Sequence, residues 1–171
     1  NNARAIADLF AEESGKFVCA SAGHNLEALM AANGSGAVGL SRKDHQTILN
    51  IDVGGGTVKL GLCHNGKLLA TSAFAVGGRL IAFDDDGRMV RIEGPAEQVA
   101  EDVGVKLTLG EVLSKEERKK IVSRMVDVIV SYATRDPNDD LCKALLLTEN
   151  LPQTPAIDGI TFSGGVSEYI Y

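Results

Sequence analysis

The sequence predicts an α/β fold in which a mixed sheet with antiparallel strands is flanked by helices. Short apolar runs at residues 47–53, 58–64 and 67–75 are typical of three consecutive strands. Asn65-Gly66 joins the second run to the third, and this dipeptide favours a two-residue hairpin turn because it tolerates positive φ. The long amphipathic segment at residues 114–135 has an apolar face broad enough to lie against such a sheet.

The segment at residues 114–135 carries its own start signal. Ser114 and Glu117 fit the S-x-x-E capping box, in which each side chain bonds to the other residue's backbone N–H. We expect one apolar stripe to face the sheet, with three further residues widening it. The stripe consists of Val122, Met125, Val126, Ile129 and Ala133, and the residues beside it are Ile121, Val128 and Tyr132.

Shorter elements complete the expected order. Before the sheet we expect helices at residues 3–13 and 25–32, a strand at 16–20 and a flexible turn at 34–39. After it we expect a small hairpin of 79–83 with 89–92, a helix from Pro95, a helix at 141–148 and a closing strand at 157–162. The chain begins without Met and stops at Tyr171 among apolar residues, so we expect a piece of a longer protein.

Composition argues against two kinds of partner. The net charge of -6 provides no basic field for a nucleic-acid backbone, and 5% aromatic residues offer few stacking platforms. No apolar run approaches the roughly 20 residues that cross a bilayer, and the start lacks a signal-peptide pattern. We therefore expect a cytoplasmic protein that binds neither nucleic acid nor membrane.

Cysteine and histidine offer no metal site. Cys19, Cys63 and Cys142 are far apart and lie among apolar neighbours, which is typical of small core residues in a reducing compartment. The histidines are not spaced as metal ligands, so we expect them on the surface or at helix ends; they are His24, His45 and His64. The acidic turn at residues 84–86 is expected to be solvated.

The first candidate site is the turn after the strand at residues 47–53. Asp52 ends that strand, Gly54, Gly55 and Gly56 form the turn, and Thr57 leads into the next strand. Glycine lets backbone N–H groups approach a phosphate, the hydroxyl adds a hydrogen bond, and a carboxylate can orient hydrated Mg²⁺ or an attacking water. The pattern is neither a P-loop nor a Rossmann fingerprint. Such a turn can also be purely structural.

A second element raises the weight of the first. The apolar strand at residues 157–162 opens on Gly164-Gly165-Val166, where a helix should begin. Small residues at this position would let a flat adenine or ribose lie on the backbone. Two such elements about a hundred residues apart indicate a nucleotide site more strongly than either one alone.

These segments resemble a known superfamily. Residues 52–57 (DVGGGT) resemble the second phosphate loop of the actin, sugar-kinase and heat-shock-chaperone ATPases, and residues 163–166 (SGGV) resemble their adenosine motif. The small-residue helix at 25–36 is similar to the interdomain helix that precedes that loop. Four stretches most resemble the EutA family of ethanolamine ammonia-lyase reactivating factors: residues 20–23, 50–57, 76–80 and 162–168.

The resemblance implies a partial RNase H-like (actin-like) ATPase fold of two lobes. Residues 1–46 would form the end of the first lobe and the connecting helix, and residues 47–171 the second lobe, truncated at its C-terminus. It implies ATP and Mg²⁺ as cofactors, ethanolamine ammonia-lyase as partner, and adenosylcobalamin as cargo of that lyase. The expected location is the cytoplasm, with a bacterial microcompartment as the alternative.

The resemblance also assigns roles to residues. Asp52 would hold Mg²⁺ or orient water, and with Thr57 it makes up the predicted catalytic pair. Gly54, Gly55, Gly56 and Thr57 would cradle phosphate. Gly164, Gly165 and Val166 would contact adenosine, whereas Gly77 and Gly78 would approach the nucleotide less directly.

Two departures from the superfamily pattern affect the expected activity. The first phosphate loop is not in this sequence, and Lys59 stands where the heat-shock chaperones carry a second aspartate. We expect the lysine to neutralise phosphate charge and the ATPase to be weak. Two alternatives stay open: a small-molecule kinase of the same superfamily, and a filament or scaffold protein that uses nucleotide as a switch.

Overall fold

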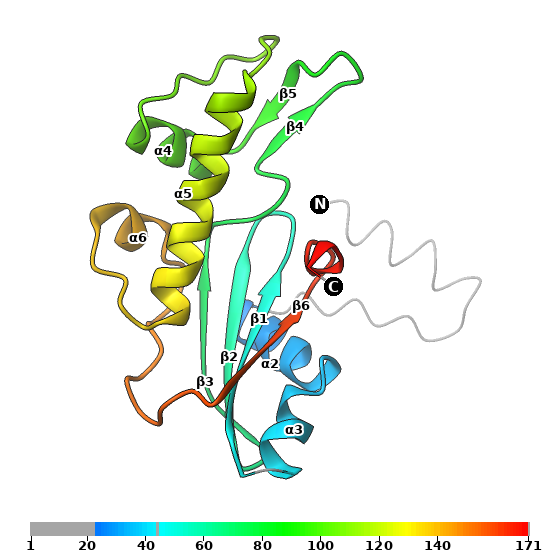
Figure 1. Ribbon diagram of the computed structural model, residues 1–171, viewed down its shortest axis with the longest axis vertical. Helices are drawn as coiled ribbons and strands as arrows, with labels where there is room; N and C mark the ends of the chain where they lie inside the picture. The colour runs from blue at the N-terminus through cyan, green and yellow to red at the C-terminus, as the bar shows by residue number, and fades with distance from the viewer. Residues whose placement is uncertain (1–22, 44, 171) are drawn as a thin grey trace, which may run out of the picture.

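The computed structural model describes residues 23–43 and 45–170, which form a mixed sheet with helices on both faces and a smaller sheet at one end (Figure 1). The main sheet has four strands in the order β3-β2-β1-β6. They are β1 (Thr47–Val53), β2 (Val58–His64), β3 (Lys67–Phe74) and β6 (Gly159–Ser163). The first three run antiparallel and β6 runs parallel to β1, so the predicted mixed sheet is confirmed.

The turn between β2 and β3 has the predicted form. Asn65 and Gly66 have φ values of 49° and 76°. A type I′ hairpin turn needs positive φ at both central residues. The sequence signal at this dipeptide therefore sets the register of the hairpin.

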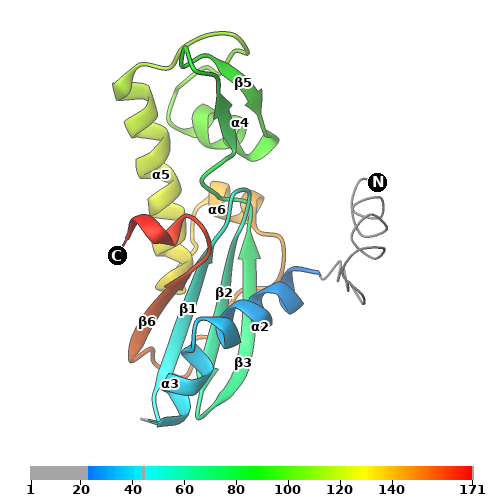
Figure 2. The same ribbon diagram turned by 90° about the vertical axis from the view of Figure 1, so that its right-hand side faces the viewer.

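Helices cover both faces of the main sheet. The first pair lies on one face and the second pair on the other (Figure 2). The first pair is α2 (His24–Gly34) and α3 (Ala37–Lys43), and the second is α5 (Lys115–Ala133) and α6 (Asp140–Leu145). The larger hydrophobic core lies between the sheet and the second pair, and a smaller cluster lies beneath the first pair.

The glycine-rich stretch before β1 differs from its prediction as a flexible turn. The chain turns only at Ser35 and Gly36, where Gly36 has a φ of 83°, and α3 begins at the next residue. Ala37 is fully buried in the smaller cluster and anchors the first turn of α3. Tertiary burial thus overrides the low helix propensity of the nearby glycines.

A small second sheet extends beyond the main one. It pairs β4 (Ile81–Phe83) with β5 (Met89–Ile92), and α4 (Gly94–Asp102) follows with Pro95 in its first turn. Both the hairpin and the helix start agree with prediction. The predicted capping box at Ser114 and Glu117 is present, and it starts α5.

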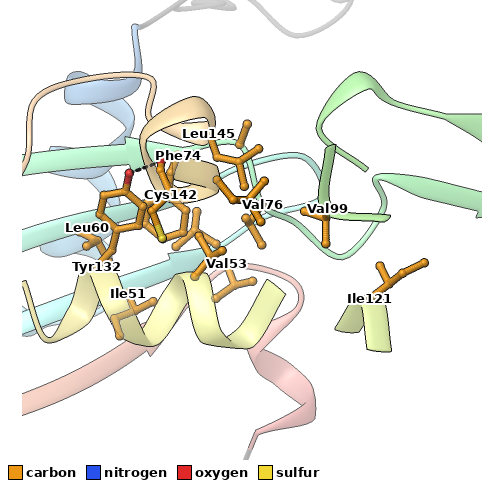
Figure 3. Packing of buried hydrophobic residues seen from close by; sticks show 14 of the residues in the cluster. Ile51, Val53, Leu60, Phe74, Val76, Val99, Ile121, Tyr132, Cys142 and Leu145 are labelled. Atoms are coloured by element: carbon orange, nitrogen blue, oxygen red, sulfur yellow. Dashed lines mark hydrogen bonds between the residues drawn. The ribbon is translucent and has the colours of Figure 1, made fainter. Parts of the chain in front are cut away.

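The buried face of α5 is rotated from the predicted stripe. Ile121, Val128 and Tyr132 are the buried residues, whereas Val122 and Val126 are 58% and 49% exposed. Figure 3 shows Tyr132 against Phe74 of β3, with ring centroids 4.3 Å apart. The stacked pair lies in the larger core, and Met125, Ile129 and Ala133 of the predicted stripe pack against that core as partly buried residues, so the stripe is only partly buried.

The cysteines that the structure describes are core residues, as predicted. Cys63 and Cys142 are fully buried, and desolvation by burial raises the pKa of each thiol to about 11. The carbonyl of Cys142 accepts a hydrogen bond of 2.6 Å from the hydroxyl of Tyr132 (Figure 3). Cys19, the expected helix at residues 3–13 and the expected strand at 16–20 lie outside the described residues.

Candidate functional site

Three glycine-rich segments meet at one end of the main sheet. The loop at residues 54–57 joins β1 to β2, residues 77–78 follow β3, and residues 164–165 follow β6. Because β1 and β6 are parallel, their C-terminal ends lie at the same edge. The structure therefore brings together all the segments that the sequence marked as candidates.

The loop after β1 has open space beside it and carries backbone N–H groups without a partner among the described residues. The N–H of Gly54 closes the loop by donating to the carbonyl of Thr57 at 3.0 Å. Within the described residues, the N–H groups of Gly55 and Gly56 have no hydrogen-bond partner. A Cβ at Gly56 would meet nothing within 4 Å, and one at Gly55 would come no closer than 3.6 Å to Arg79. Internal packing does not require glycine here, whereas an approaching ligand would.

Gly77 and Gly78 have a different role from these loop glycines. A Cβ at Gly77 would lie 2.4 Å from the Gly55 carbonyl oxygen, and one at Gly78 would lie 2.7 Å from Val166 Cγ2. The N–H groups of Gly78 and Arg79 donate to the carbonyls of Gly54 and Gly55 at 3.1 and 2.7 Å. This segment supports the backbone of the loop, a contact that the sequence did not predict; its expected approach to the nucleotide stays a prediction.

The turn after β6 is anchored on β1. Gly164 has a φ of 89°, and a Cβ there would lie 2.4 Å from the Val53 carbonyl oxygen. The same carbonyl accepts a hydrogen bond of 3.3 Å from the N–H of Val166. A Cβ at Gly165 would meet nothing within 4 Å. Gly164 is needed for the turn, and Gly165 leaves an open backbone surface beside it.

Asp52 lies at the end of β1 on the sheet face that α2 and α3 cover. Side chains alternate along a strand, so Asp52 points away from the face of its neighbour Val53. Asp52 Oδ1 accepts a hydrogen bond of 3.0 Å from Ser163 Oγ. Lys59 is directly opposite on β2, and its Nζ lies 2.9 Å from Glu27 Oε2 on α2. The ammonium group that we expected to neutralise phosphate already has a carboxylate partner.

An apolar cavity of about 360 Å³ lies beside the end of the sheet, on the face that α5 covers and opposite the face that carries Asp52. Its lining includes Val53, Gly78 and Val166 from the candidate segments, and Val122 and Met125 from α5. No motif in the sequence marks α5 as part of the site. The available signal was the width of its apolar face, which exceeds what one sheet covers.

The chemistry of these groups fits a magnesium nucleotide. Free backbone N–H groups and the Thr57 hydroxyl suit phosphate oxygens, and an apolar wall suits a base. Mg²⁺ keeps several of its waters and is usually bound through one or two carboxylates, so a site with Asp52 as its one carboxylate would be compatible with it. Among the described residues, the candidate site included, no group of three or more His, Cys, Asp or Glu side chains is arranged to hold a metal ion.

The fold and the site define a mixed α/β domain whose glycine-rich segments converge at one end of its sheet. The chain belongs to the family described as "Ethanolamine utilisation protein EutA", whose model matches residues 1–171. This confirms the family that the sequence motifs indicated.

Two curated relatives carry the name "Ethanolamine ammonia-lyase reactivase EutA". The chain is 36% identical over 167 residues to that of Salmonella typhimurium (strain LT2), and 36% identical over 169 residues to that of Escherichia coli (strain K12). Each match covers 98% of this chain and 36% of the relative, so the chain spans about a third of their length. A crystal structure of MreB 5 of Spiroplasma citri bound to AMPPNP matches with a TM-score of 0.43 and 22% identity, over 96% of this chain and 53% of that one.

Among the helices at residues 23–43 and 45–170, none has the length and apolarity of a membrane span.

Proposed function

We propose that the protein containing this chain is an ATP-dependent reactivating factor for adenosylcobalamin-dependent ethanolamine ammonia-lyase. It exchanges damaged cobalamin on the lyase for intact cofactor, and it works in ethanolamine utilisation in the bacterial cytoplasm or at a microcompartment. The observation that carries the proposal is the family membership of the whole chain, together with the name of the relatives. The two-lobed actin-like organisation, with its boundary at residue 46, belongs to the same proposal.

The convergence of the three glycine-rich segments supports the nucleotide part. The N–H groups of Gly55 and Gly56 would hold phosphate oxygens, with the Thr57 hydroxyl beside them. Asp52 would hold hydrated Mg²⁺ or orient a water molecule. Gly165 and the apolar cavity would receive the adenosine. Gly77 and Gly78 would keep the loop in place through the backbone contacts described above.

The free energy of nucleotide binding at such a site is suited to driving movement between the two lobes of the proposed fold. When bound, Mg-ATP would place its γ-phosphate at the loop. Hydrolysis to ADP and phosphate would remove the contacts made to that group, and the loss of such contacts can drive the opening and closing of lobes. The loop and the turn at Gly164 are held together by the Val53 carbonyl. A shift of one element would therefore be transmitted to the other.

The kinase alternative has less support. Transfer of phosphate to a metabolite needs a carboxylate base near the acceptor hydroxyl. Among the described residues of the loop and the cavity lining there is no carboxylate, and Arg118 is the charged residue of the lining. Asp52 lies on the opposite face of the sheet end, so its position suits metal or water better than an acceptor in the cavity.

Rescue of a blocked lyase tests the proposal. Full-length protein is mixed with Mg-ATP, adenosylcobalamin and ethanolamine ammonia-lyase that has been inactivated with an adenosyl-lacking cobalamin, and acetaldehyde formation is followed. We expect turnover to return with the parent protein and not with Asp52→Ala. Asp85→Ala is the matched control, because Asp85 is exposed in the turn between β4 and β5 and belongs to none of the glycine-rich segments.

Two other outcomes of this experiment would contradict the reactivase proposal. Absence of recovery under every nucleotide condition, together with ATP-dependent phosphorylation of a small alcohol or acid, would replace the reactivase with the kinase. Nucleotide-dependent sedimentation without rescue would favour the filament or scaffold protein.

A further inference from the structure

A chain of polar side chains crosses from β6 to β1 beneath the candidate site. The two strands are parallel, and their register places Asn50 opposite Thr161 and Asp52 opposite Ser163. All four residues lie on the face that α2 and α3 cover, because they alternate with the apolar residues of the larger core. This row of polar side chains ends at Asp52 on β1, and its last member on β6, Ser163, directly precedes Gly164.

The hydrogen bonds of this chain run in one direction. The Thr161 hydroxyl donates to Asn50 Oδ1 at 2.9 Å, and Asn50 Nδ2 donates to Ser163 Oγ at 3.0 Å. Ser163 Oγ then donates to Asp52 Oδ1 at 3.0 Å. Each donor polarises the next, so the last bond to the carboxylate gains strength from those behind it.

The burial of Asn50 indicates that these hydrogen-bonded side chains do more than fill space in the core. Its side chain is completely buried, and an amide taken out of water is costly unless all its groups are bonded. Ile48, two residues earlier on the same face, is an apolar core residue of the smaller cluster. An apolar residue at position 50 would avoid the cost of desolvation, but it would leave Ser163 without its donor.

The consequence is a fixed orientation for Asp52. Its Oδ1 is held toward β6, while Oδ2 accepts no hydrogen bond from any residue in the described ranges. Lys59, the cation opposite Asp52 on β2, is paired with Glu27 instead. One oxygen is thus engaged and the other is left for an external ligand.

We propose that Ser163 and Asn50 are positioning residues that orient the Asp52 carboxylate toward a nucleotide-bound Mg²⁺. This inference rests on the proposed nucleotide function. Because Ser163 directly precedes Gly164, the same hydroxyl connects the carboxylate to the turn that would hold adenosine. Binding at either element therefore affects the geometry of the other.

Titration calorimetry on the full-length protein tests the role, with ATP in the presence of Mg²⁺ and with ATP in EDTA. Loss of a residue that orients a metal ligand typically weakens metal affinity by about 10- to 100-fold. We expect Ser163→Ala to raise the Mg²⁺ concentration needed for half-maximal ATP binding by about that factor, with metal-free ATP binding unchanged. Ser163→Thr keeps the hydroxyl and should restore the Mg²⁺ dependence. Asn50→Leu should show a smaller loss of the same kind.

The outcomes separate this inference from the function on which it rests. Mg-ATP binding that is insensitive to Ser163→Ala overturns the positioning role alone. Equal weakening with and without Mg²⁺, or failure of Ser163→Thr to rescue, assigns Ser163 to structure and also overturns it. Absence of Mg-ATP binding by the parent protein overturns the proposed function and the positioning role with it.

Discussion

Lys59 Nζ lies 2.9 Å from Glu27 Oε2, so helix α2 is joined by an ion pair to the strand directly opposite Asp52. The side chain of Lys59 is only 12% exposed, whereas that of Glu27 is 45% exposed. The small residues of α2 pack close to the same strand, since a Cβ at Gly61 would lie 3.0 Å from the Ala32 Cβ. Lys59 therefore belongs to the contact between helix and sheet.

The first prediction concerns this ion pair. Partly exposed pairs of this kind contribute about 0.2–1 kcal/mol, so Lys59→Met and Glu27→Gln should each lower the melting temperature slightly. The double variant should lose little more than either single one. Mg-ATP affinity should change by less than about twofold, because the side chain of Lys59 pairs with Glu27 on α2 and not with the nucleotide. A large affinity loss in Lys59→Met, with none in Glu27→Gln, would instead mean that Lys59 contacts phosphate.

The second prediction separates two kinds of glycine at the site. Gly56→Ala places a methyl group in open space where phosphate would lie, so the melting temperature should be unchanged and Mg-ATP affinity should fall by about tenfold or more. Gly77→Ala places its Cβ 2.4 Å from the Gly55 carbonyl oxygen, and overpacking of this kind costs about 1–3 kcal/mol. Gly77→Ala should therefore lower the melting temperature by several degrees.

Thermal unfolding and calorimetric titration of the full-length variants check this contrast. Gly165→Ala serves as a second probe on the adenosine side, since its Cβ would also meet nothing within 4 Å. Undiminished Mg-ATP affinity in Gly56→Ala would remove the loop from the binding site.

Local signals explain which parts of the fold the sequence could predict. The Asn65-Gly66 turn and the Ser114–Glu117 capping box are formed by neighbouring residues, so their patterns are complete within a few positions. The buried face of α5 includes the stacking of Tyr132 against Phe74, residues that are distant in the sequence. Helix α3 depends in the same way on the burial of Ala37 beneath the sheet. Neither contact produces a pattern among neighbouring residues from which it could be predicted.

The candidate site likewise combines features that the local sequence predicts with features that depend on distant contacts. The glycines at positions 54–56 and 164–165 could be proposed from the sequence because a nucleotide site is expected to use that residue type in consecutive positions. The separate role of Gly77, which packs on the Gly55 carbonyl, could only be seen once β3 had been placed beside the loop. The polar chain through Asn50 likewise depends on the register of β1 with β6.

The last prediction concerns Asp139, which caps α6 and contacts α5. Asp139 Oδ1 accepts the Cys142 N–H at 2.7 Å, and Oδ2 lies 2.8 Å from Arg124 Nη2. The backbone bond from Cys142, and then the Arg124 guanidinium, lower the pKa of the Asp139 carboxyl. A lowered folded-state pKa gives stability that is present above the unfolded value and is lost as the pH falls through the folded value.

Asp139→Asn isolates this contribution, because asparagine keeps the N-cap acceptor and loses the charge. At pH 7 the variant should melt about 1–3 °C below the parent, which corresponds to a partly exposed ion pair of about 0.5–1 kcal/mol. The difference should begin to shrink below about pH 4, the ordinary range for an aspartate, because the unfolded parent then binds a proton, and it should disappear once the pH has fallen through the lower folded-state value. Asp140→Asn, which changes the adjacent exposed carboxylate, controls for net charge. A difference between parent and Asp139→Asn that stays constant from pH 7 to pH 3 would show that the pairing with Arg124 contributes nothing to stability.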